Sequence, residues 1–415
     1  MKNALNIDNR IQSLYLQAGQ DSKEAFFRIE EIALFNQQKV LNAFISNGVS
    51  EYHLHGSTGY GLNDAGRETL EKIYCDIFKC ERSLVRANFV SGTHAIGVVF
   101  YALLSKGDNF ISITGKPYDT LNSVINNKEA GNSLVNTGVI YKEIDLTENG
   151  SFDKEKIKNQ IDEKTKLIFI QRSCGYSWRK SSSIEDIAEI TKFVKSLKKD
   201  IIVFVDNCYG ELVEEREPNE VGVDICAGSL IKNLGAGIAP CGGYITGRED
   251  LVKLCAQRFT IPHIEDNLGA TLNTNRLLYQ GLFMAPSVVA NAVKSSVIAS
   301  YIFEKLGFLV KPRFDEHRTD LICAVKLGSK ELLQKFCQSV QNNSPVDSKA
   351  VLMPHLQPGY TNPIIMASGS FTQGSSIELS ADGPMREPYT AYLQGGLSYE
   401  HAVLAILKAA EIFVN

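Results

Sequence analysis

The chain has 415 residues, 44% of them hydrophobic and 22% charged, which is typical of a folded globular protein and excludes a disordered or fibrous one. Lys and Arg number 43 against 47 Asp and Glu, so the net charge of −4 offers no basic surface for nucleic acid and no polybasic membrane anchor. The apolar runs are too short to cross a bilayer, and the first ten residues lack the apolar segment of a signal peptide. We expect a cytoplasmic protein of two or three domains with a small-molecule partner.

The amino-terminal part of the chain reads as helical. An amphipathic helix is predicted over residues 24–46, followed by a Gly-rich loop at 56–61. A second helix is predicted over 67–78, where apolar residues recur at the spacing of one helix face. We assign residues 1–55 to an amino-terminal helical arm.

From residue 84 onward, short β-branched runs alternate with helical patterns. Strands are predicted at residues 110–113, 139–144, 167–170, 201–205 and 243–246. Helices are predicted at 95–104 and 184–197, and a sequence resembling a capping box, Ser183 to Asp186, precedes the second. This alternation predicts a mostly parallel sheet covered on both faces, with ligands bound at the carboxyl ends of its strands.

After Pro286 the pattern changes again. A helical pattern runs to residue 306, and the remainder of the chain reads as a smaller α+β domain. Its predicted strands are 308–310, 321–325 and 376–379, and its closing helix is 399–413. We therefore place a large domain at 56–285 and a small carboxyl-terminal domain at 286–415, joined by a helical linker.

Two residues at the expected ligand edge carry reactive groups. Asp206 ends the apolar run 201–205, where an unpaired carboxylate is costly, so it is a helix cap, half of a buried ion pair, or a partner for a ligand cation. Lys232 lies among glycines and apolar residues. Burial lowers the pKa of such a lysine, and a neutral amine can form a Schiff base with an aldehyde; the alternative is a surface lysine.

A helix start and an aromatic ring add two further groups. Ser91, Gly92 and Thr93 open the helix predicted at 95–104, where free N–H groups form an anion site, unless the hydroxyls only cap the helix. We expect His94 to pack at the helix start. Tyr118 follows a predicted strand and could stack on a heteroaromatic cofactor.

Taken together, the acid, the lysine, the helix start and the ring are the parts that pyridoxal 5'-phosphate requires. An Asp keeps the pyridine nitrogen protonated so that the ring accepts electrons. Lys232 would carry the aldehyde and then return as the base that moves protons between substrate carbons.

The order SGT, PYDT, VDNCYGE and GSLIKN resembles that of the fold-type I pyridoxal phosphate enzymes of cysteine and methionine metabolism. Longer stretches resemble the branch called methionine γ-lyase-like or aluminium-resistance proteins, within the cystathionine β-lyase and γ-lyase family: HLHGSTGYGLNDAGRETLE, IQRSCGYSWR, VDNCYGELVEEREP, SLIKNLGAGIAPCGGYI and SADGPMREPYTAYLQGGL. The resemblance spans most of residues 50–400. It implies an α/β fold in which the large domain binds the cofactor on a mainly parallel seven-stranded sheet. It further implies a small α+β domain and a site shared across the interface of a homodimer or homotetramer.

The resemblance also implies roles by position. Lys232 would hold the cofactor covalently, Asp206 would pair with the pyridinium, and Tyr118 would stack on the ring. The phosphate would be bound by Ser91, Gly92, Thr93 and Ser229, and by Tyr60 from the neighbouring subunit.

Three departures from the family pattern concern anion binding. Leu62 stands where the better-known γ-lyases have an arginine, so the phosphate loses a cation unless Arg67 substitutes. Ile231 replaces a phosphate-binding threonine. The usual Arg-Leu-Ser that grips the substrate carboxylate is not evident in 392–396.

A new carboxylate clamp is therefore needed, and the planar guanidinium of arginine suits it. Arg386 is our candidate, with Arg172 and Arg179 as alternatives; each could instead form a surface ion pair.

Metal and dinucleotide sites are not predicted. The nine cysteines are odd in number and include no CxxC pair, which argues against a disulfide framework or zinc knuckle. His53 and His55 could share one strand face but lack a third ligand at suitable spacing. The segment Gly235 to Gly237 lacks the third glycine of a dinucleotide fingerprint, and a nicotinamide dehydrogenase stays as a third alternative.

The expected activity is a lyase that eliminates a β- or γ-substituent from a sulfur-containing amino acid such as methionine, cystathionine or cysteine. The alternatives are a γ-replacement synthase or an aldolase-type enzyme on the same cofactor, and a cofactor-binding stress protein with vestigial catalysis.

Overall fold

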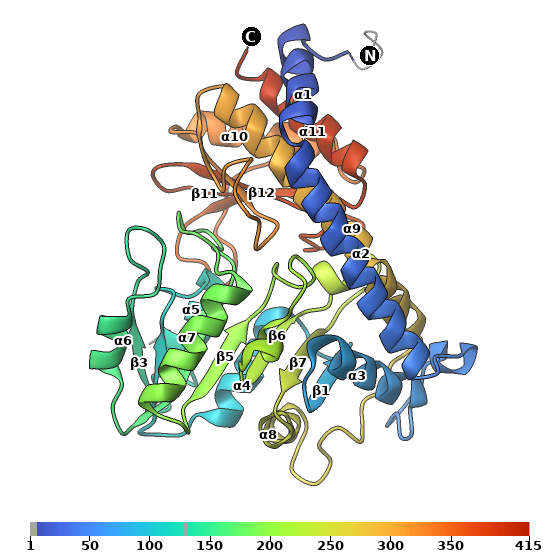
Figure 1. The fold of residues 1–415 in the computed structure, drawn as a ribbon, viewed down its shortest axis with the longest axis vertical. Coiled ribbons are helices and arrows are strands. Elements are labelled where there is room, and N and C mark those ends of the chain that lie inside the picture. The colour runs from blue at the N-terminus through green and yellow to red at the C-terminus, as the bar shows by residue number, and fades with distance from the viewer. Residues whose placement is uncertain (1–5, 128, 130, 415) are drawn as a thin grey trace.

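The computed structural model describes residues 6–127, 129 and 131–414, which form two sheets joined by a long helix (Figure 1). The larger sheet has seven strands in the order β1-β7-β6-β5-β4-β2-β3. Its strands are β1 Arg82–Arg86, β2 Asn109–Ser112, β3 Ile140–Glu143, β4 Thr165–Gln171, β5 Ile202–Asp206, β6 Ile225–Ser229 and β7 Gly243–Gly247. Only β7 runs against its neighbours, so the sheet is mainly parallel, as the sequence predicts.

Helices cover this sheet on both faces. On one face, apolar side chains of the strands pack against α4 Gly92–Leu103, α5 Asp119–Asn126 and α8 Glu249–Phe259. On the other, they pack against α6 Lys154–Gln160 and α7 Ile184–Leu197, while α3 Ala65–Phe78 covers the β1–β7 edge. The strands are nearly continuous apolar runs because both of their faces are buried.

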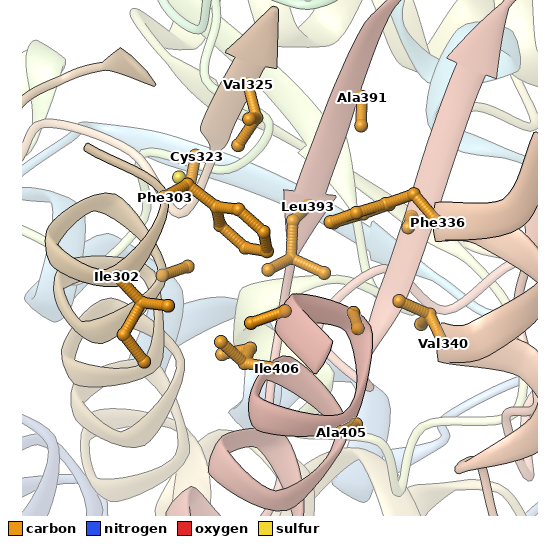
Figure 2. Close-up of a cluster of buried hydrophobic side chains, with 14 of the residues drawn as sticks. Ile302, Phe303, Cys323, Val325, Phe336, Val340, Ala391, Leu393, Ala405 and Ile406 are labelled. Carbon is orange, nitrogen blue, oxygen red and sulfur yellow. The ribbon is translucent and has the colours of Figure 1, made fainter. Parts of the chain in front are cut away.

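The smaller sheet is antiparallel, with five strands in the order β10-β11-β12-β9-β8. Its strands are β8 Leu309–Lys311, β9 Cys323–Lys326, β10 Ile364–Ala367, β11 Ser380–Pro384 and β12 Thr390–Gln394. Helices α10 Lys330–Asn342 and α11 Tyr399–Glu411 cover it, together with the end of α9 and with α1 Asn9–Asp21. Figure 2 shows the resulting core, in which Phe303 of α9, Phe336 of α10 and Leu393 of β12 meet.

Helix α9, Asn275–Lys305, connects the two sheets and lies beside α2, Lys23–Ser46 (Figure 1). By length and composition α9 could cross a membrane, but 72% of its apolar window is buried inside the molecule, as in the core helix of a soluble protein. The helix begins eleven residues before Pro286, where the sequence predicts its start, because a proline inside a helix disguises the helical pattern that precedes it.

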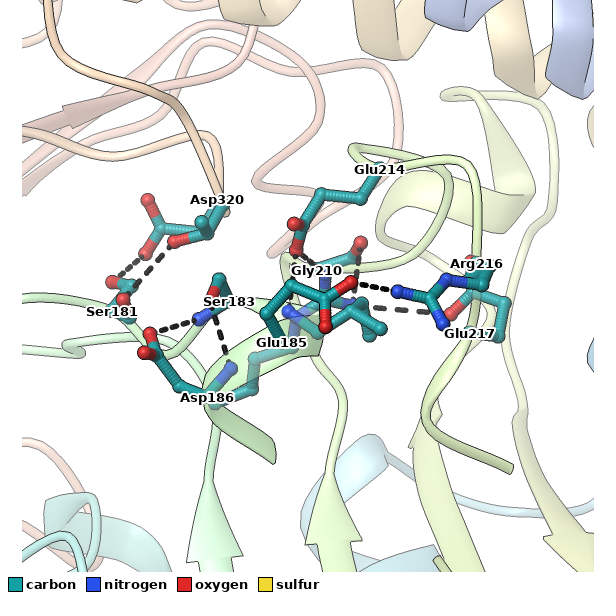
Figure 3. Close-up of polar contacts among 12 residues, drawn as sticks. Ser181, Ser183, Glu185, Asp186, Gly210, Glu214, Arg216, Glu217 and Asp320 are labelled. Atoms are coloured by element: carbon teal, nitrogen blue, oxygen red, sulfur yellow. Dashed lines mark hydrogen bonds and ion pairs between the residues drawn. The ribbon is translucent and has the colours of Figure 1, made fainter. Parts of the chain in front are cut away.

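Most predicted elements are confirmed within a few residues, and α7 matches both predicted bounds. Ser183 Oγ accepts a hydrogen bond from the Asp186 N–H while the Asp186 carboxylate accepts one from the Ser183 N–H, each at 3.0 Å (Figure 3). This reciprocal cap satisfies N–H groups that would otherwise lack partners at the helix start.

The strand predicted at 376–379 is wrong. These residues form turns, and β11 begins at Ser380. The Glu378 carboxylate accepts hydrogen bonds from the N–H groups of Phe371 and Thr372 at 2.8 and 2.9 Å, which stabilises the turn. A buried turn can place apolar residues at alternate positions just as a strand does, so periodicity alone misassigns it.

Candidate active site

A pocket of about 460 Å³ opens at the carboxyl ends of β2, β4, β5 and β6, where a parallel sheet is expected to bind its ligand. Its lining includes Thr93, Tyr118, Asp206, Cys208, Tyr209 and Lys232. Four of the predicted site residues, Thr93, Tyr118, Asp206 and Lys232, therefore share one cavity.

Asp206 is the last residue of β5 and is 7% exposed. Its carboxylate accepts a hydrogen bond from the Cys208 N–H at 3.1 Å, and among the described residues it forms no ion pair. Burial raises the pKa of Asp206, although the positive charge of Lys232 opposes the shift. A buried carboxylate in this position is available to a cationic group of a ligand.

Lys232 lies three residues after the end of β6, and its side chain is partly buried in the pocket, so it is not a surface lysine. Its Nζ is 4.1 Å from the ring centre of Tyr209. Burial lowers the pKa of Lys232, but the acidic groups of Cys208, Tyr209 and Asp206 raise it more, so the pKa lies above its ordinary value. The predicted lowering is wrong because it counted desolvation alone and not the acidic groups that the turn after β5 brings to the amine.

The helix start expected to bind phosphate lies against the end of β6. Ser91 caps α4, and its Oγ accepts a hydrogen bond from the His94 N–H at 3.1 Å, which leaves its O–H to donate elsewhere. A Cβ added at Gly92 would lie 2.9 Å from Cβ of Ser229, so glycine permits this close approach. Thr93 Oγ1 lies 3.1 Å from Thr120 Oγ1. The structure thus brings the start of α4, at Gly92, next to Ser229.

Tyr118 contacts two other tyrosines, Tyr176 and Tyr360, that the sequence analysis did not identify as site residues. Its N–H donates to Gln171 Oε1 at 2.7 Å, which fixes the start of α5 against β4. Its hydroxyl donates to the Tyr176 hydroxyl at 3.2 Å and also contacts the Tyr360 hydroxyl. Tyr360 precedes β10 in the smaller domain, so both parts of the molecule contribute to this wall of the pocket. Only the stretch IQRSCGYSWR, quoted for its resemblance, pointed toward Tyr176.

Arg172 does not fit the predicted role of substrate clamp. It is fully buried, and its guanidinium pairs with Glu214 at 2.6 Å and donates to Asn207 Oδ1 and the Gly210 carbonyl at 2.8 and 2.9 Å. A guanidinium engaged in this way holds the turn after β5 and is not free to bind a substrate.

Two other arginines also bind backbone carbonyls. Arg179 donates to the carbonyl oxygens of Gln171 at 2.7 Å and of Ser173, which supports the pocket wall and is not a surface ion pair. Arg67 is buried, and its guanidinium donates to the carbonyls of Gly61 and Gly269 at 2.7 and 2.8 Å. We therefore do not propose Arg67 as the replacement phosphate cation.

Arg386 remains available as a clamp. It is exposed in the turn between β11 and β12 and, among the described residues, it has no carboxylate partner. Its guanidinium makes one long hydrogen bond, 3.4 Å, to the carbonyl of Tyr176. It therefore lies beside the tyrosine wall and not inside the pocket.

Tyr60 lies outside this pocket. It is 75% exposed in the Gly-rich loop, so it adds nothing to the site of its own chain. The predicted role of Tyr60 toward a neighbouring subunit stays a prediction.

His53 acts as a local cap. Its Nδ1 accepts a hydrogen bond from the Ser50 N–H at 3.0 Å. Within the part of the chain that the structure describes, no group of three His, Cys, Asp or Glu residues could hold a metal ion.

Glu211 is a buried carboxyl near Lys232 that sequence reasoning missed. It is fully buried, accepts a hydrogen bond from the Tyr244 hydroxyl at 2.9 Å, and has one oxygen without a partner. Burial raises its pKa to about 8, although its own N–H and the Tyr244 hydroxyl oppose the shift. We infer that Glu211 is protonated at neutral pH.

Replacing Glu211 by Gln is expected to stabilise the protein increasingly as the pH rises. Because the folded pKa is about 8 and the ordinary value 4.5, the folded state holds a proton that the unfolded state loses, so wild-type stability falls through this range. The amide of the variant is neutral like the protonated acid, and its stability does not change with pH through this group. The unfolding free energy of Glu211→Gln should therefore exceed that of the wild type by an amount that grows by a few kcal/mol as the pH rises. Thermal unfolding of both proteins across this pH range measures it, and a constant difference would refute a protonated Glu211.

The donors in the pocket fit the predicted cofactor. The buried carboxylate of Asp206, which forms no ion pair among the described residues, suits a pyridinium N–H, and the lysine amine suits an aldehyde. The start of α4, with the Ser91 and Ser229 hydroxyls beside it, suits a phosphate dianion. These groups all lie at one edge of the larger sheet.

Comparisons with known proteins agree with this geometry. A family model described as methionine gamma-lyase matches residues 11–414. The chain is 46% identical over 386 residues to the uncharacterized protein YnbB of Bacillus subtilis, with 92% of each chain covered. A solved structure from Clostridium acetobutylicum, named as a candidate cystathionine beta-lyase involved in aluminum resistance, is 47% identical with a TM-score of 0.94, and the match covers 99% of this chain and 96% of that one.

Two further solved structures place the chain within its fold. A carbon-sulfur lyase involved in aluminum resistance from Clostridium novyi is 45% identical with a TM-score of 0.94, over 98% of this chain and 97% of that one. A candidate O-acetylhomoserine (thiol)-lyase from Campylobacter jejuni, 17% identical with a TM-score of 0.59 over 85% and 86% of the two chains, shares the fold and carries a pyridoxyl-lysine. Since the family model spans nearly the whole chain, this protein belongs to the methionine gamma-lyase family of fold-type I pyridoxal phosphate enzymes.

Proposed function

We propose that this protein is a cytoplasmic pyridoxal phosphate-dependent carbon–sulfur lyase that eliminates a β- or γ-substituent from a sulfur-containing amino acid such as methionine, cystathionine or cysteine. One observation carries the proposal: Asp206, a buried carboxylate that forms no ion pair with any residue the structure describes, lines the same pocket as Lys232. The family membership and the names of the solved relatives support carbon–sulfur lyase chemistry.

The bound cofactor would supply an electron sink for the carbanion that forms when the substrate loses its α-proton. Asp206 would hold the pyridine nitrogen protonated through a charge-assisted hydrogen bond. Ser91, Thr93 and Ser229, with the N–H groups at the start of α4, would bind the phosphate.

The residues of the chain would divide the proton transfers. The Lys232 amine would take the α-proton and later return a proton to a substrate carbon. Tyr118 would pack against the cofactor ring, and Tyr60 would complete the phosphate site of a neighbouring subunit in a homodimer or homotetramer. That last role suits its exposed position.

Arg386 would bind the substrate carboxylate, because its guanidinium is exposed beside Tyr176 without a carboxylate partner. Replacing Arg386 by Ala is expected to raise KM by about 10- to 100-fold, the value of a hydrogen-bonded charge pair, with a smaller change in kcat. The assay screens sulfur amino acids for release of thiol and keto acid.

The matched control is Arg313→Ala, which removes an exposed arginine of the same domain that pairs with Glu304. An unchanged KM in Arg386→Ala would exclude the clamp. Absence of keto acid from every amino acid tested with the wild type would refute the lyase itself.

A further inference from the structure

A line of hydrogen bonds leads from the pocket to a buried carboxylate of the smaller domain. The Tyr118 hydroxyl donates to the Tyr176 hydroxyl at 3.2 Å, and the Tyr176 hydroxyl donates to Asp382 Oδ2 at 2.8 Å. The Tyr360 hydroxyl contacts Tyr118 from the other side. The two donated hydrogens of Tyr118 and Tyr176 thus run along one line from the pocket residue Tyr118 to Asp382.

Asp382 lies in β11 and is 6% exposed. Besides Tyr176, its carboxylate accepts a hydrogen bond from Gln394 Nε2 of β12 at 3.0 Å, and among the described residues it forms no ion pair. Both of these partners are neutral, so the negative charge is solvated only by two hydrogen bonds. The carboxyl can therefore change its protonation state without breaking an ion pair.

The titratable groups near Asp382 come from several elements: Tyr118 and Tyr176 of the pocket wall, Tyr209 after β5, Lys232 after β6, Tyr360 before β10, Cys337 of α10, and Tyr392 of β12, which lies opposite Asp382 in the sheet. Of these, only Lys232 is charged when the thiol and the phenols are neutral. Its positive charge favours the ionised carboxylate but is outweighed by burial.

Tyr118 and Tyr176 stay protonated at neutral pH, whereas the carboxyl group of Asp382 can be ionised or protonated. Burial raises the pKa values of Tyr118 and Tyr176 well above the ordinary value of 10, so neither forms a phenolate. Burial also raises the pKa of Asp382, to about 6, although the hydrogen bonds from Tyr176 and Gln394 oppose the shift. Among the three linked groups, Asp382 is the one that gains and loses a proton near neutral pH.

We propose that Asp382 is a positioning residue that acts through Tyr176 to make Tyr118 a proton acceptor in the pocket, with Asp382 as the final holder of the proton. The proposal rests on the proposed function, in which an amino-acid substrate enters with a protonated amino group that must lose its proton to react.

The proton balance needs no other reactant. A proton from the substrate ammonium binds the oxygen of Tyr118, the hydrogen of Tyr118 passes to Tyr176, and the hydrogen of Tyr176 passes to Oδ2 of Asp382. Both phenols stay neutral, the carboxylate becomes a carboxylic acid, and the substrate amine becomes neutral. The reverse shift returns the proton to the pocket later in the cycle.

Two conservative variants separate this role from a structural one. Asp382→Asn keeps an oxygen that accepts from Tyr176 but cannot take up a proton, and Tyr176→Phe keeps the ring but removes the link. Gln394, the other hydrogen-bond partner of Asp382, is left unchanged, because a glutamate there would add a second buried charge beside Asp382. As a control, Tyr141→Phe removes a hydroxyl on the edge strand β3 whose one hydrogen bond among the described residues goes to Glu143.

The experiment measures kcat/KM against pH for the full chain with added pyridoxal phosphate. The wild type should lose activity as the pH falls through about 6, because Asp382 must be ionised to accept a proton. Asp382→Asn and Tyr176→Phe should each lower kcat/KM by about 100-fold and lack this acid limb, and the double variant should be no worse than either single one. The cofactor absorbance should be unchanged in both. Wild-type activity or an unchanged acid limb in Asp382→Asn would overturn the proposal.

A second arm uses the cofactor-free protein, so that failure of the proposed function is seen separately. Infrared difference spectra should show the band of a protonated carboxyl appearing as the pH falls through about 6, and this band should be absent in Asp382→Asn. In Tyr176→Phe the midpoint should shift upward, because a hydrogen bond to the carboxylate is lost. No such band, or an unchanged midpoint in Tyr176→Phe, would overturn the proposal even if the wild type proved to be an active lyase. If no amino acid is turned over, these spectra alone decide whether the three groups are coupled.

Discussion

Replacing Lys232 by Ala is expected to lower kcat for thiol release by about 10³-fold or more, because one side chain supplies both the nucleophile and the base. Among the described residues it is the one lysine that lines the pocket, with its Nζ 4.1 Å from the ring centre of Tyr209. The assay compares kcat of the two proteins with saturating pyridoxal phosphate.

Chemical rescue separates lost chemistry from lost structure. A small primary amine added to Lys232→Ala should restore part of the turnover, because it can replace the missing base in the vacated space. Lys253→Ala, which removes an exposed lysine of α8, should behave as wild type. Full activity of Lys232→Ala without added amine would contradict the role assigned to this residue.

Replacing Asp206 by Asn is expected to lower kcat by about 10²- to 10³-fold, the usual cost of removing a preorganised charge opposite a reacting group. Affinity for pyridoxal phosphate should fall by about 10- to 100-fold, because the charge-assisted hydrogen bond to the ring nitrogen becomes a neutral one. Asparagine keeps the shape of the side chain and can still accept from the Cys208 N–H.

The same variant should be at least as stable as the wild type at neutral pH. Burial raises the pKa of Asp206, so folding disfavours its ionised form, and the neutral amide avoids that cost. Thermal unfolding of the cofactor-free proteins measures this, while kinetics measures the loss of function. A destabilised Asp206→Asn, or one with normal cofactor affinity, would show that the carboxylate serves the fold and not the ligand.

The central groups of the site could be predicted because they follow directly from local sequence. Asp206 ends a predicted apolar strand, so the rule that ligands bind at the carboxyl ends of parallel strands places it at the ligand edge, and Lys232 was identified by the glycines and apolar residues around it. Ser91 and Gly92 open a helix whose capping residues are adjacent in sequence. For such residues, a local pattern and a known sheet geometry suffice.

The surroundings of these groups could not be predicted, because they depend on contacts between distant segments. Arg172 looked free until the structure paired it with Glu214, 42 residues away. Tyr360 contacts Tyr118, and Asp382 contacts Tyr176, from the smaller domain. No spacing of residues in the sequence predicts these contacts. The strand β6 was missed because its alanine, glycine and serine lack the β-branched bias by which strands are identified.

The most direct test of the account is the visible absorption of the purified protein as pyridoxal phosphate is added. If Lys232 attaches the cofactor covalently in the pocket, the wild type should develop a visible band that saturates at one cofactor per chain, and Lys232→Ala should not. Borohydride should then fix the cofactor to the peptide that contains Lys232 in the wild type only. A wild-type protein that stays colourless, or a band that survives unchanged in Lys232→Ala, would contradict the account.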